Sequence, residues 1–261
     1  MLKNKVAVIS GCNRGIGLST LEAFSENGAD IFACVRNIDD NFLKKIDVLK
    51  LNYGNKIFPV KFDLSNKDSI VSAIKLINNY EKNLNIVVNN AGIIHNKLFQ
   101  LTKLDEIYKT FEINFFNQIF FTQGLLRNIM KTKNGSIIFL SSSAAQDGNI
   151  GRSAYSSSKA ALASFAKVLS RELGAQKIRV NTISPGLTET DMMIDSTAKE
   201  YLENIVKEIP LKRIANPADV SKLILYLSSD LSEYITGQDL RIDGGLKWLI
   251  KKIKHLILQK V

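Results

Sequence analysis

Strand-length apolar runs alternate with stretches of helical spacing along most of this 261-residue chain. The apolar runs lie at residues 5–10, 30–35, 56–62, 84–90, 135–141, 178–184 and 239–242. Helical spacing covers residues 16–27, 66–80, about 102–131, 153–174 and 217–229. Strands that are separated by helices predict repeated βαβ units and a parallel sheet covered on both faces. We therefore expect an α/β protein with one domain, built on a doubly wound, seven-stranded parallel sheet.

The composition excludes several classes of protein. Cys12 and Cys34 are the two cysteines, too few for a disulfide scaffold or a cysteine-rich zinc site, and two histidines are too few for a histidine-based metal site. The amino terminus enters a strand directly and lacks the apolar stretch of a signal peptide. No apolar run approaches the ~20 residues that span a bilayer. These features predict a reduced, cytoplasmic protein without a metal.

The formal net charge of +10 is unevenly distributed along the chain. Residues 246–261 hold five lysines and no acid, so that +10 less these five leaves +5 for residues 1–245. An anionic substrate, cofactor or carrier explains this remainder as well as a polynucleotide does. Because no helix–turn–helix or zinc-finger pattern is present, we expect no nucleic-acid partner.

The last sixteen residues form a segment of their own, which divides the chain into a domain at 1–245 and a basic amphipathic tail at 246–261. Leu249, Ile253, Leu256 and Ile257 mark an apolar stripe at helical spacing. The stripe predicts packing on a neighbouring subunit or on the chain's own domain. Contact with an anionic membrane surface is the alternative that we favour less.

The loop after the first strand, SGCNRGIGLST, predicts a phosphate-binding turn, since ligands of such sheets bind beyond the carboxyl ends of the strands. Gly11, Gly15 and Gly17 permit a tight turn and close backbone approach, and the following helix directs N–H groups at an anion. Alone, this pattern fits a turn without a ligand equally well. Arg14 lies in the loop and Arg36 follows the second strand, where NAD-binding folds usually carry an acid. Unless both are ordinary surface residues, they favour NADP(H) over NAD(H).

The segment SAYSSSKAAL at 153–162 places Tyr155 one helical turn before Lys159. A nearby ammonium stabilises a phenolate and lowers the pKa of a phenol, which otherwise lies near ~10. The pair therefore predicts a group that protonates a carbonyl oxygen as the carbonyl is reduced. For an isolated Y-x-x-x-K pattern, a solvated helix surface is the alternative.

Several further motifs follow in a characteristic order. They are Asp63-Leu64 after the third strand, NNAG at 89–92, Asn114, Ser142, SPGLTETDM at 184–192, and a YITGQDLRIDGG ending near Gly245. Together with the glycine loop and the Tyr–Lys pair, they make the chain resemble the short-chain dehydrogenase/reductase family over about 245 residues. The segment ASFAKVLSRELGAQKIRVNTISPG is most similar to the 3-oxoacyl-[acyl-carrier-protein] reductase branch, although sugar, steroid and polyol enzymes share much of this background.

This resemblance implies a Rossmann-type fold and an NADPH-dependent ketoreductase that acts on a 3-oxoacyl thioester. Reduction of a sugar or another small carbonyl is one alternative, and a silent NADP(H)-binding sensor or scaffold is another. Tyr155 would be the general acid and Lys159 would also hold the nicotinamide ribose. Ser142 would bind the substrate carbonyl, and Asn114 would fix a water linking Lys159 to solvent. The implied cofactor-binding residues are Gly11, Asn13, Arg14, Gly15, Ile16, Gly17, Arg36, Asp63, Leu64, Asn90, Ala91, Gly92, Tyr155, Lys159, Pro185, Gly186 and Thr188.

The resemblance also implies partners. A homo-oligomer, either a tetramer or a dimer, would form through the helices at about 102–131 and 153–174. Residues 189–212 would be a variable substrate lid, in which Met192, Met193 and Ile205 line an apolar pocket or simply pack the lid. Lys133 and Lys177 would form a basic patch beside the cleft for a carrier protein.

Overall fold

A computed structural model of the chain describes residues 1–132, 134–196 and 199–246. Within them, seven parallel strands form one sheet in the order β3-β2-β1-β4-β5-β6-β7. The strands are β1 (Val6–Ser10), β2 (Asp30–Val35), β3 (Ile57–Lys61), β4 (Ile86–Asn89), β5 (Gly135–Leu140), β6 (Ile178–Pro185) and β7 (Asp239–Ile242). The strand order reverses between β1 and β4, so the predicted doubly wound sheet is confirmed and its switch point lies there.

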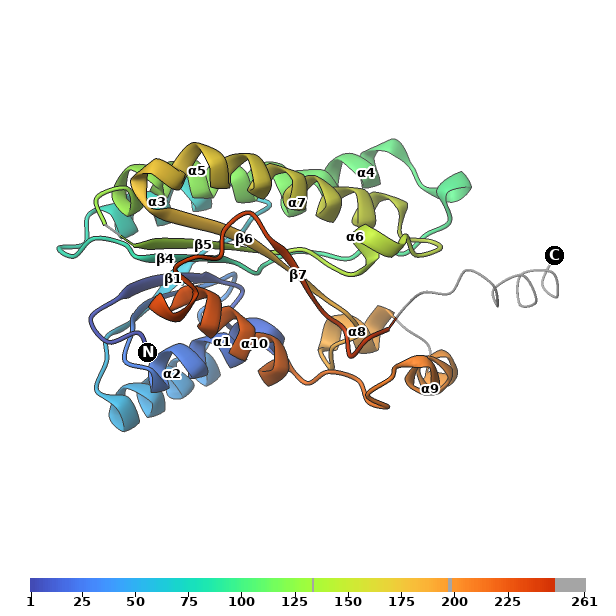
Figure 1. Ribbon diagram of the computed structural model, residues 1–261, viewed down its shortest axis with the longest axis horizontal. Coiled ribbons are helices and arrows are strands. Elements are labelled where there is room, and N and C mark those ends of the chain that lie inside the picture. The colour runs from blue at the N-terminus through green and yellow to red at the C-terminus, as the bar shows by residue number, and fades with distance from the viewer. Residues whose placement is uncertain (133, 197–198, 247–261) are drawn as a thin grey trace.

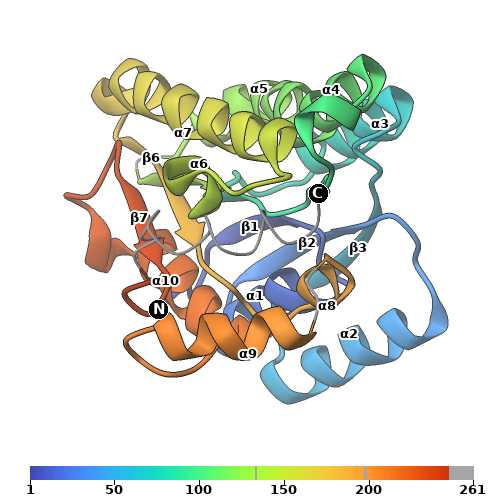
Figure 2. The same cartoon turned by 90° about the vertical axis from the view of Figure 1, so that its right-hand side faces the viewer.

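Helices cover both faces of this sheet (Figure 1). One layer contains α3 (Lys67–Asn78), α4 (Leu104–Phe111), α5 (Asn117–Ile129) and α7 (Ser153–Leu173). The other contains α1 (Gly15–Glu26), α2 (Asp40–Tyr53) and α10 (Pro217–Ser228). The shorter elements are η1 (Phe99–Leu101), α6 (Ala144–Asp147), η3 (Gly174–Gln176), α8 (Asp191–Ser196), α9 (Lys199–Glu208) and η4 (Asp230–Ser232). Helices α8 and α9 lie beyond one end of the sheet (Figures 1 and 2).

The central strands β1, β4, β5 and β6 are buried on both sides, because alternate side chains enter two separate hydrophobic cores. In β1, Val6 and Val8 join the core under α3, α5 and α7, whereas Ala7 and Ile9 join the core that contains α1, α2 and α10. This arrangement explains why the strands read as continuous apolar runs rather than as an alternating pattern. It also holds the carboxyl ends of β1, β4, β5 and β6 together at one edge.

Two helical features differ from the sequence prediction. Helix α2 was not predicted, and its apolar periodicity is weak because Phe42 and Ile46 are its buried residues. Its ends nevertheless carry local signals: Asp39 accepts a hydrogen bond from the Phe42 N–H, and Gly54 ends the helix at φ 70°. The helix predicted at about 102–131 is interrupted by a π-helical turn, η2 (Glu112–Phe116). Such turns occur frequently at functional sites.

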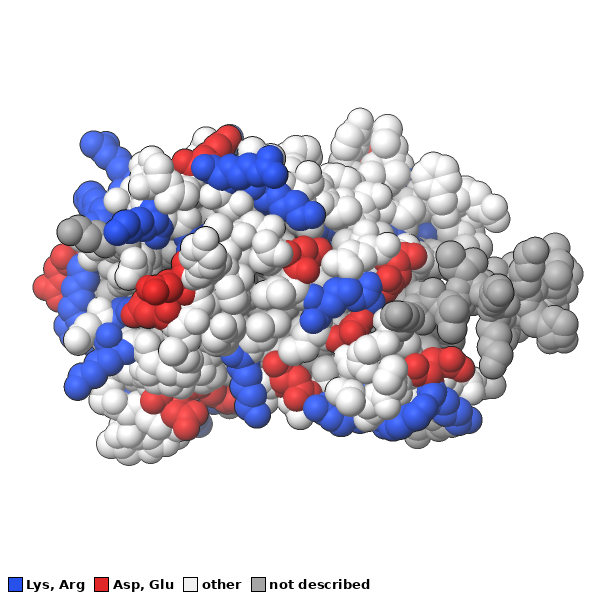
Figure 3. All heavy atoms as spheres, in the orientation of Figure 1, with Lys and Arg blue, Asp and Glu red and all other residues white. Residues whose placement is uncertain are grey.

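The predicted tail lies outside the described residues from position 247 onward, as does Lys133. Its first residue, Leu246, is buried in a small cluster with Ile205 of α9 and with Ile209, which directly follows that helix. Among the helices that are described, none combines the length and the apolar character needed to cross a membrane. On the face drawn in Figure 3, Lys and Arg side chains are interspersed with Asp and Glu.

Candidate active site

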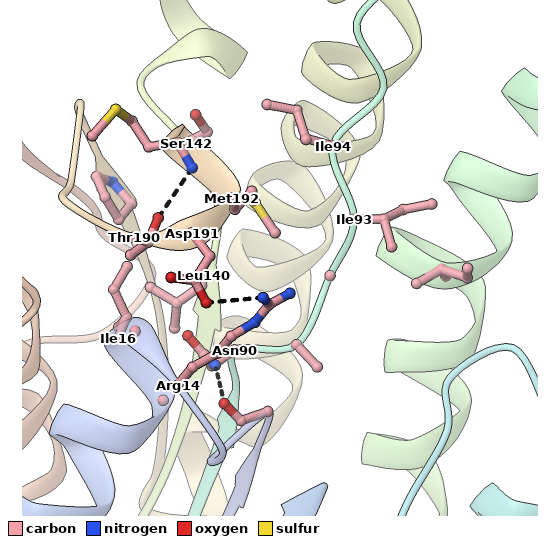
Figure 4. A pocket seen from close by; sticks show the side chains of 18 of the residues that line it. Arg14, Ile16, Asn90, Ile93, Ile94, Leu140, Ser142, Thr190, Asp191 and Met192 are labelled. Atoms are coloured by element: carbon pink, nitrogen blue, oxygen red, sulfur yellow. Dashed lines mark hydrogen bonds and ion pairs between the residues drawn. The ribbon is translucent and has the colours of Figure 1, made fainter. Parts of the chain in front are cut away.

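A cleft of about 830 Å³ opens beyond the carboxyl ends of β1, β4, β5 and β6, at the predicted edge of the sheet. The loops after these strands line it, together with the start of α7 and part of α8 (Figure 4). Every residue predicted from the sequence to bind the cofactor lines this cleft, and so do Ser142, Tyr155 and Lys159. Asn114 is the predicted site residue that lies behind the cleft wall.

The glycine loop has the shape that close approach of a phosphate requires. Gly11 and Gly15 adopt φ values of 78° and 55°, which side-chain-bearing residues rarely accept. A Cβ at Gly17 would overlap the carbonyl oxygen of Gly11, so the loop folds back onto the first turn of α1 only because no side chain is there. Helix α1 begins at Gly15 without a side-chain cap. Its first N–H groups therefore remain available to an anion, and the loop fits a dinucleotide pyrophosphate.

The NNAG segment after β4 fixes the glycine loop from the adjacent strand. The Asn90 side-chain amide donates to the Ser10 carbonyl oxygen at 2.8 Å. In return, the Ser10 hydroxyl accepts from the backbone N–H groups of Asn90 and Ala91, both at 3.0 Å. These reciprocal bonds join the two strand ends at the switch point.

The two arginines predicted to contact the cofactor both line the cleft, in different environments. Arg14 forms an ion pair with Asp191 of α8, with 2.9 Å between Nη1 and Oδ2 (Figure 4). Arg36 is exposed at the end of β2. Its charge acts on Asp63: burial raises the pKa of Asp63, but hydrogen bonds from Ser65 and the Arg36 charge lower it overall.

Tyr155 lies on α7 with its side chain almost fully buried, at 8% exposure. Burial raises the pKa of its phenol above the ordinary value of 10. A hydrogen bond with the Ser142 side chain and the positive charge of Arg152 act in the opposite direction and are outweighed. The predicted lowering of this pKa by Lys159 is therefore wrong, because desolvation of the phenol dominates.

Lys159 lies one turn further along α7, as predicted, and is 4% exposed. Its ammonium donates to the Leu140 carbonyl oxygen at the end of β5, at 2.6 Å. Burial lowers the pKa of Lys159 from 10.5 to about 8, so the ammonium is still the main form at neutral pH. The predicted pair is thus present in the cleft, with a neutral phenol and an amine that loses its proton more readily than a free lysine.

The structure distinguishes the three consecutive serines after β5. Ser141 and Ser142 both line the cleft, but only the Ser142 side chain bonds with Tyr155, and its hydroxyl also accepts from the Ala144 N–H at 3.2 Å. Ser141 is buried and its hydroxyl donates to the Lys159 carbonyl oxygen at 3.0 Å. Ser143 is also buried, and its N–H donates to the Pro185 carbonyl oxygen at 2.9 Å. Ser142 is therefore the serine whose hydroxyl meets Tyr155 inside the cleft.

Asn114 lies on the π-helical turn and is fully buried. Its carboxamide oxygen accepts from the Ile93 N–H, and its NH₂ group donates to the Ile93 carbonyl oxygen, both at 2.8 Å. The same NH₂ group reaches the Ser158 hydroxyl on α7 at 3.2 Å. A Cβ at Gly92 would lie 3.0 Å from the Asn114 oxygen and 3.4 Å from the Lys159 nitrogen, which explains the glycine. Asn114 thus joins the NNAG loop to the helix that carries Tyr155.

One further expectation, the place of Lys177 beside the cleft, needs correction. Lys177 directly precedes β6, whereas the cleft lies at the other end of that eight-residue strand, a distance of roughly 25 Å at the usual rise per residue. Lys177 therefore does not lie beside this chain's own cleft.

Arg152, which lines the cleft one turn before Tyr155, was not predicted as a site residue. Its position three residues before Tyr155, which is one helical turn, was the signal in the sequence that could have placed it at the site.

Comparisons with known proteins agree with this geometry. The family model described as "Enoyl-(Acyl carrier protein) reductase" matches residues 11–247. The chain is similar to the 3-oxoacyl-[acyl-carrier-protein] reductase FabG of Aquifex aeolicus, with 32% identity over 246 residues, covering 94% of this chain and 98% of that protein. The Chlamydia pneumoniae FabG is also 32% identical, over 250 residues, covering 95% of this chain and 98% of the relative.

Solved structures resemble the whole chain as well. A short-chain type dehydrogenase/reductase from Mycobacterium marinum superposes with a TM-score of 0.86 at 29% identity, covering 95% of this chain and 97% of its own. One from Mycobacterium ulcerans gives a TM-score of 0.87 at 25% identity, covering 94% of this chain and 90% of its own. The likeness therefore extends over nearly the entire length of each protein.

Proposed function

The chain belongs to the short-chain dehydrogenase/reductase family and is an NAD(P)-dependent oxidoreductase, and on that premise we propose that it is an NADPH-dependent ketoreductase of 3-oxoacyl thioesters. The observation that carries the proposal is the meeting of the Tyr155 phenol, the Ser142 hydroxyl and the Lys159 ammonium in one cleft with the glycine loop. The reaction class is inferred from these groups. The choice of a 3-oxoacyl thioester as the substrate is inferred from the names of the relatives.

The residues have distinct roles in this proposal. Bound NADPH supplies the hydride. Ser142 donates a hydrogen bond to the substrate carbonyl, and Tyr155 delivers its proton to the oxygen as negative charge develops there. A buried phenol with a raised pKa stays protonated at neutral pH, which suits a proton donor in the reductive direction. Lys159 holds the nicotinamide ribose and lies one helical turn from the phenol that must be reprotonated.

Asn114 has a positioning role in the same proposal. The resemblance implies that it fixes a water linking Lys159 to solvent, which stays a prediction, and both ends of its side-chain amide are bonded to protein groups. We therefore assign its side chain to holding the Ile93 backbone and α7 at a fixed separation. This keeps the Gly92 backbone close to the Lys159 ammonium.

The preference for NADPH is supported by the charges at the cofactor end of the cleft. Arg14 and Arg36 both line it, and Arg36 follows β2 at the place where an acid would select the ribose 2′-hydroxyl of NAD. A guanidinium there suits a 2′-phosphate instead. The bound cofactor would compete with Asp191 for Arg14.

A homo-oligomer is the partner that we propose, formed through the long helices. Large apolar side chains are exposed along this face, namely Leu104, Tyr108, Phe116, Met130 and Val168. Isolated exposed apolar residues are ordinary, but a group on adjacent helices is typical of a protein interface. The carrier patch has less support, because Lys177 lies at the far end of β6.

The test is an assay of NADPH oxidation with acetoacetyl thioester beside a panel of keto-sugars. We expect the thioester to be reduced, and Tyr155→Phe to lower turnover by roughly 10²- to 10⁴-fold while NADPH affinity changes little. Tyr234→Phe is the matched control, because that side chain is fully exposed. Near-normal turnover of Tyr155→Phe would contradict the role of the phenol. A preference for keto-sugars would favour a small-carbonyl reductase, and tight NADPH binding without turnover would favour a sensor.

A further inference from the structure

We propose that the cleft contains a subsite for a compact carboxylate beside the reacting carbonyl, with Arg152 as its anchor. The inference rests on the proposed ketoreductase function and extends its substrates from thioesters to short oxo acids. It is carried by the surroundings of Arg152 and by a small side pocket that continues the main cleft.

Arg152 is a half-buried arginine immediately before α7 and lines the cleft together with Tyr155. Its Nε donates to the Asn96 carboxamide oxygen at 3.0 Å, which fixes the guanidinium. No described residue accepts a hydrogen bond from its two terminal nitrogens, and no described carboxylate forms an ion pair with it. In contrast, Arg14 is paired with Asp191, and Arg241 with two aspartates. Arg152 therefore offers an oriented cation whose charge the described part of the chain leaves uncompensated.

The side pocket has a volume of about 40 Å³ and is lined by Ser142, Asn149 and Arg152, among others. Ser142, Arg152, Gly186 and Leu187 also line the main cleft, so the pocket adjoins the place where the carbonyl binds. One water occupies about 30 Å³ in the liquid. The pocket can thus admit a small group such as a carboxylate but not an acyl chain.

The Asn149 amide is a polar group of this pocket whose orientation bears on the binding of a carboxylate. The side-chain oxygen of Asn149 is buried and has no hydrogen-bond partner among the described residues. Such an atom is costly unless something satisfies it. A carboxylate cannot donate to this oxygen, so binding of a carboxylate requires that the Asn149 amide turn its NH₂ group toward the pocket and its oxygen away from it.

The charges around the pocket favour an anion of this kind. The two acids that line the cleft are engaged elsewhere, since Asp63 accepts from Ser65 and Asp191 pairs with Arg14. The Arg152 charge reaches the phenol, as its effect on the pKa of Tyr155 shows. A guanidinium binds a carboxylate through two parallel hydrogen bonds, a geometry that a neutral ester cannot match. The subsite should therefore discriminate an oxo acid from its methyl ester.

The experiment compares acetoacetate, methyl acetoacetate and acetoacetyl thioester as substrates for the full chain with NADPH. In Arg152→Gln, we expect kcat/KM for acetoacetate to fall roughly 10- to 100-fold, mainly through KM, because a charge-assisted hydrogen bond is lost. The ester and the thioester should change much less. Arg152→Lys should recover part of the loss. Arg171→Gln, an exposed arginine on the same helix, is the control.

A binding measurement separates this inference from the proposed function. Calorimetric titration of acetoacetate into the protein saturated with NADP⁺ needs no turnover. Weaker binding to Arg152→Gln than to the natural chain supports the subsite, and equal or absent binding to both overturns it. An equal fall in kcat/KM for acid and ester also overturns it. If acetoacetate binds through Arg152 but no carbonyl is reduced, the proposed function fails and the subsite stands.

Discussion

At the scale of single residues, burial controls the site more than local spacing does. Tyr155 and Lys159 occupy i and i+4 positions, from which their proximity follows. Their protonation does not follow from spacing, because desolvation raises the pKa of the phenol and lowers the pKa of the ammonium to about 8. Both shifts oppose the charged form of each group. The pair is therefore arranged to keep a neutral phenol ready to donate.

The proposed preference for NADPH is tested most directly at Arg36, which follows β2. The substitution Arg36→Asp puts a negative charge beside the proposed binding site of the NADPH 2′-phosphate. We expect NADPH affinity to fall roughly 10- to 100-fold and NADH affinity to change little, since only NADPH carries that phosphate. Fluorescence titration with both cofactors measures this. Lys44→Asp on the exposed side of α2 is the control, and an equal loss for both cofactors would refute the assignment.

At the scale of elements, the site depends on the contact between the glycine loop and the first turn of α1. The glycine loop and α1 are one unit, because Gly17 belongs to the helix and is in contact with Gly11 in the loop. The π-helical turn η2 has a similar effect on the other side of the cleft. It places Asn114 inside the protein, while Phe116, two residues later, is 53% exposed.

A substitution inside α1 tests the coupling of loop and helix. In an ordinary helix interior, Gly→Ala is favourable by up to about 1 kcal/mol. In Gly17→Ala, however, the new Cβ would overlap the Gly11 carbonyl oxygen, so we expect the loop to shift, NADPH affinity to fall at least roughly 10-fold, and stability to decrease. Titration with NADPH and urea unfolding measure the two effects.

Gly174→Ala is the matched control for this prediction. Gly174 has a helical φ of −60°, and a Cβ there would contact nothing within 4 Å. We expect unchanged cofactor affinity and stability equal to or slightly above that of the natural chain. If Gly17→Ala behaved like Gly174→Ala, the close approach of loop and helix would not matter for binding.

At the scale of the whole molecule, the exposed apolar residues on α4, η2 and α7 are the main feature that one chain leaves unexplained. Tyr108 and Phe116 are 62% and 53% exposed, and Val168 on the neighbouring long helix is 54% exposed. Burial of such side chains in a symmetric contact would favour association by about 25 cal/mol per Å² of apolar surface. This face is where we place the interface between copies of the chain.

The oligomer prediction is tested by charge substitution. The double variant Tyr108→Lys with Phe116→Lys places two cations in the proposed contact, so we expect the mass in size-exclusion chromatography with light scattering to fall to that of a smaller species. Tyr53→Lys on α2, which is 45% exposed on the other layer, should leave the mass unchanged. An oligomer that persists in the double variant would place the interface elsewhere.

The sequence alone determined the parallel sheet and the residues after its strands that were predicted to bind the cofactor, all of which line the cleft. Parallel strands buried on both faces require continuous apolar runs, and their carboxyl ends must share one edge, so the residues after each run were predictable. The tertiary structure decided the pKa directions of Tyr155 and Lys159, the hydrogen-bond partners of Ser142 and Asn114, the place of Lys177, and the exposure of Arg152 to the cleft. These properties depend on burial and on distances between groups far apart in the chain, and neither quantity is present in local spacing.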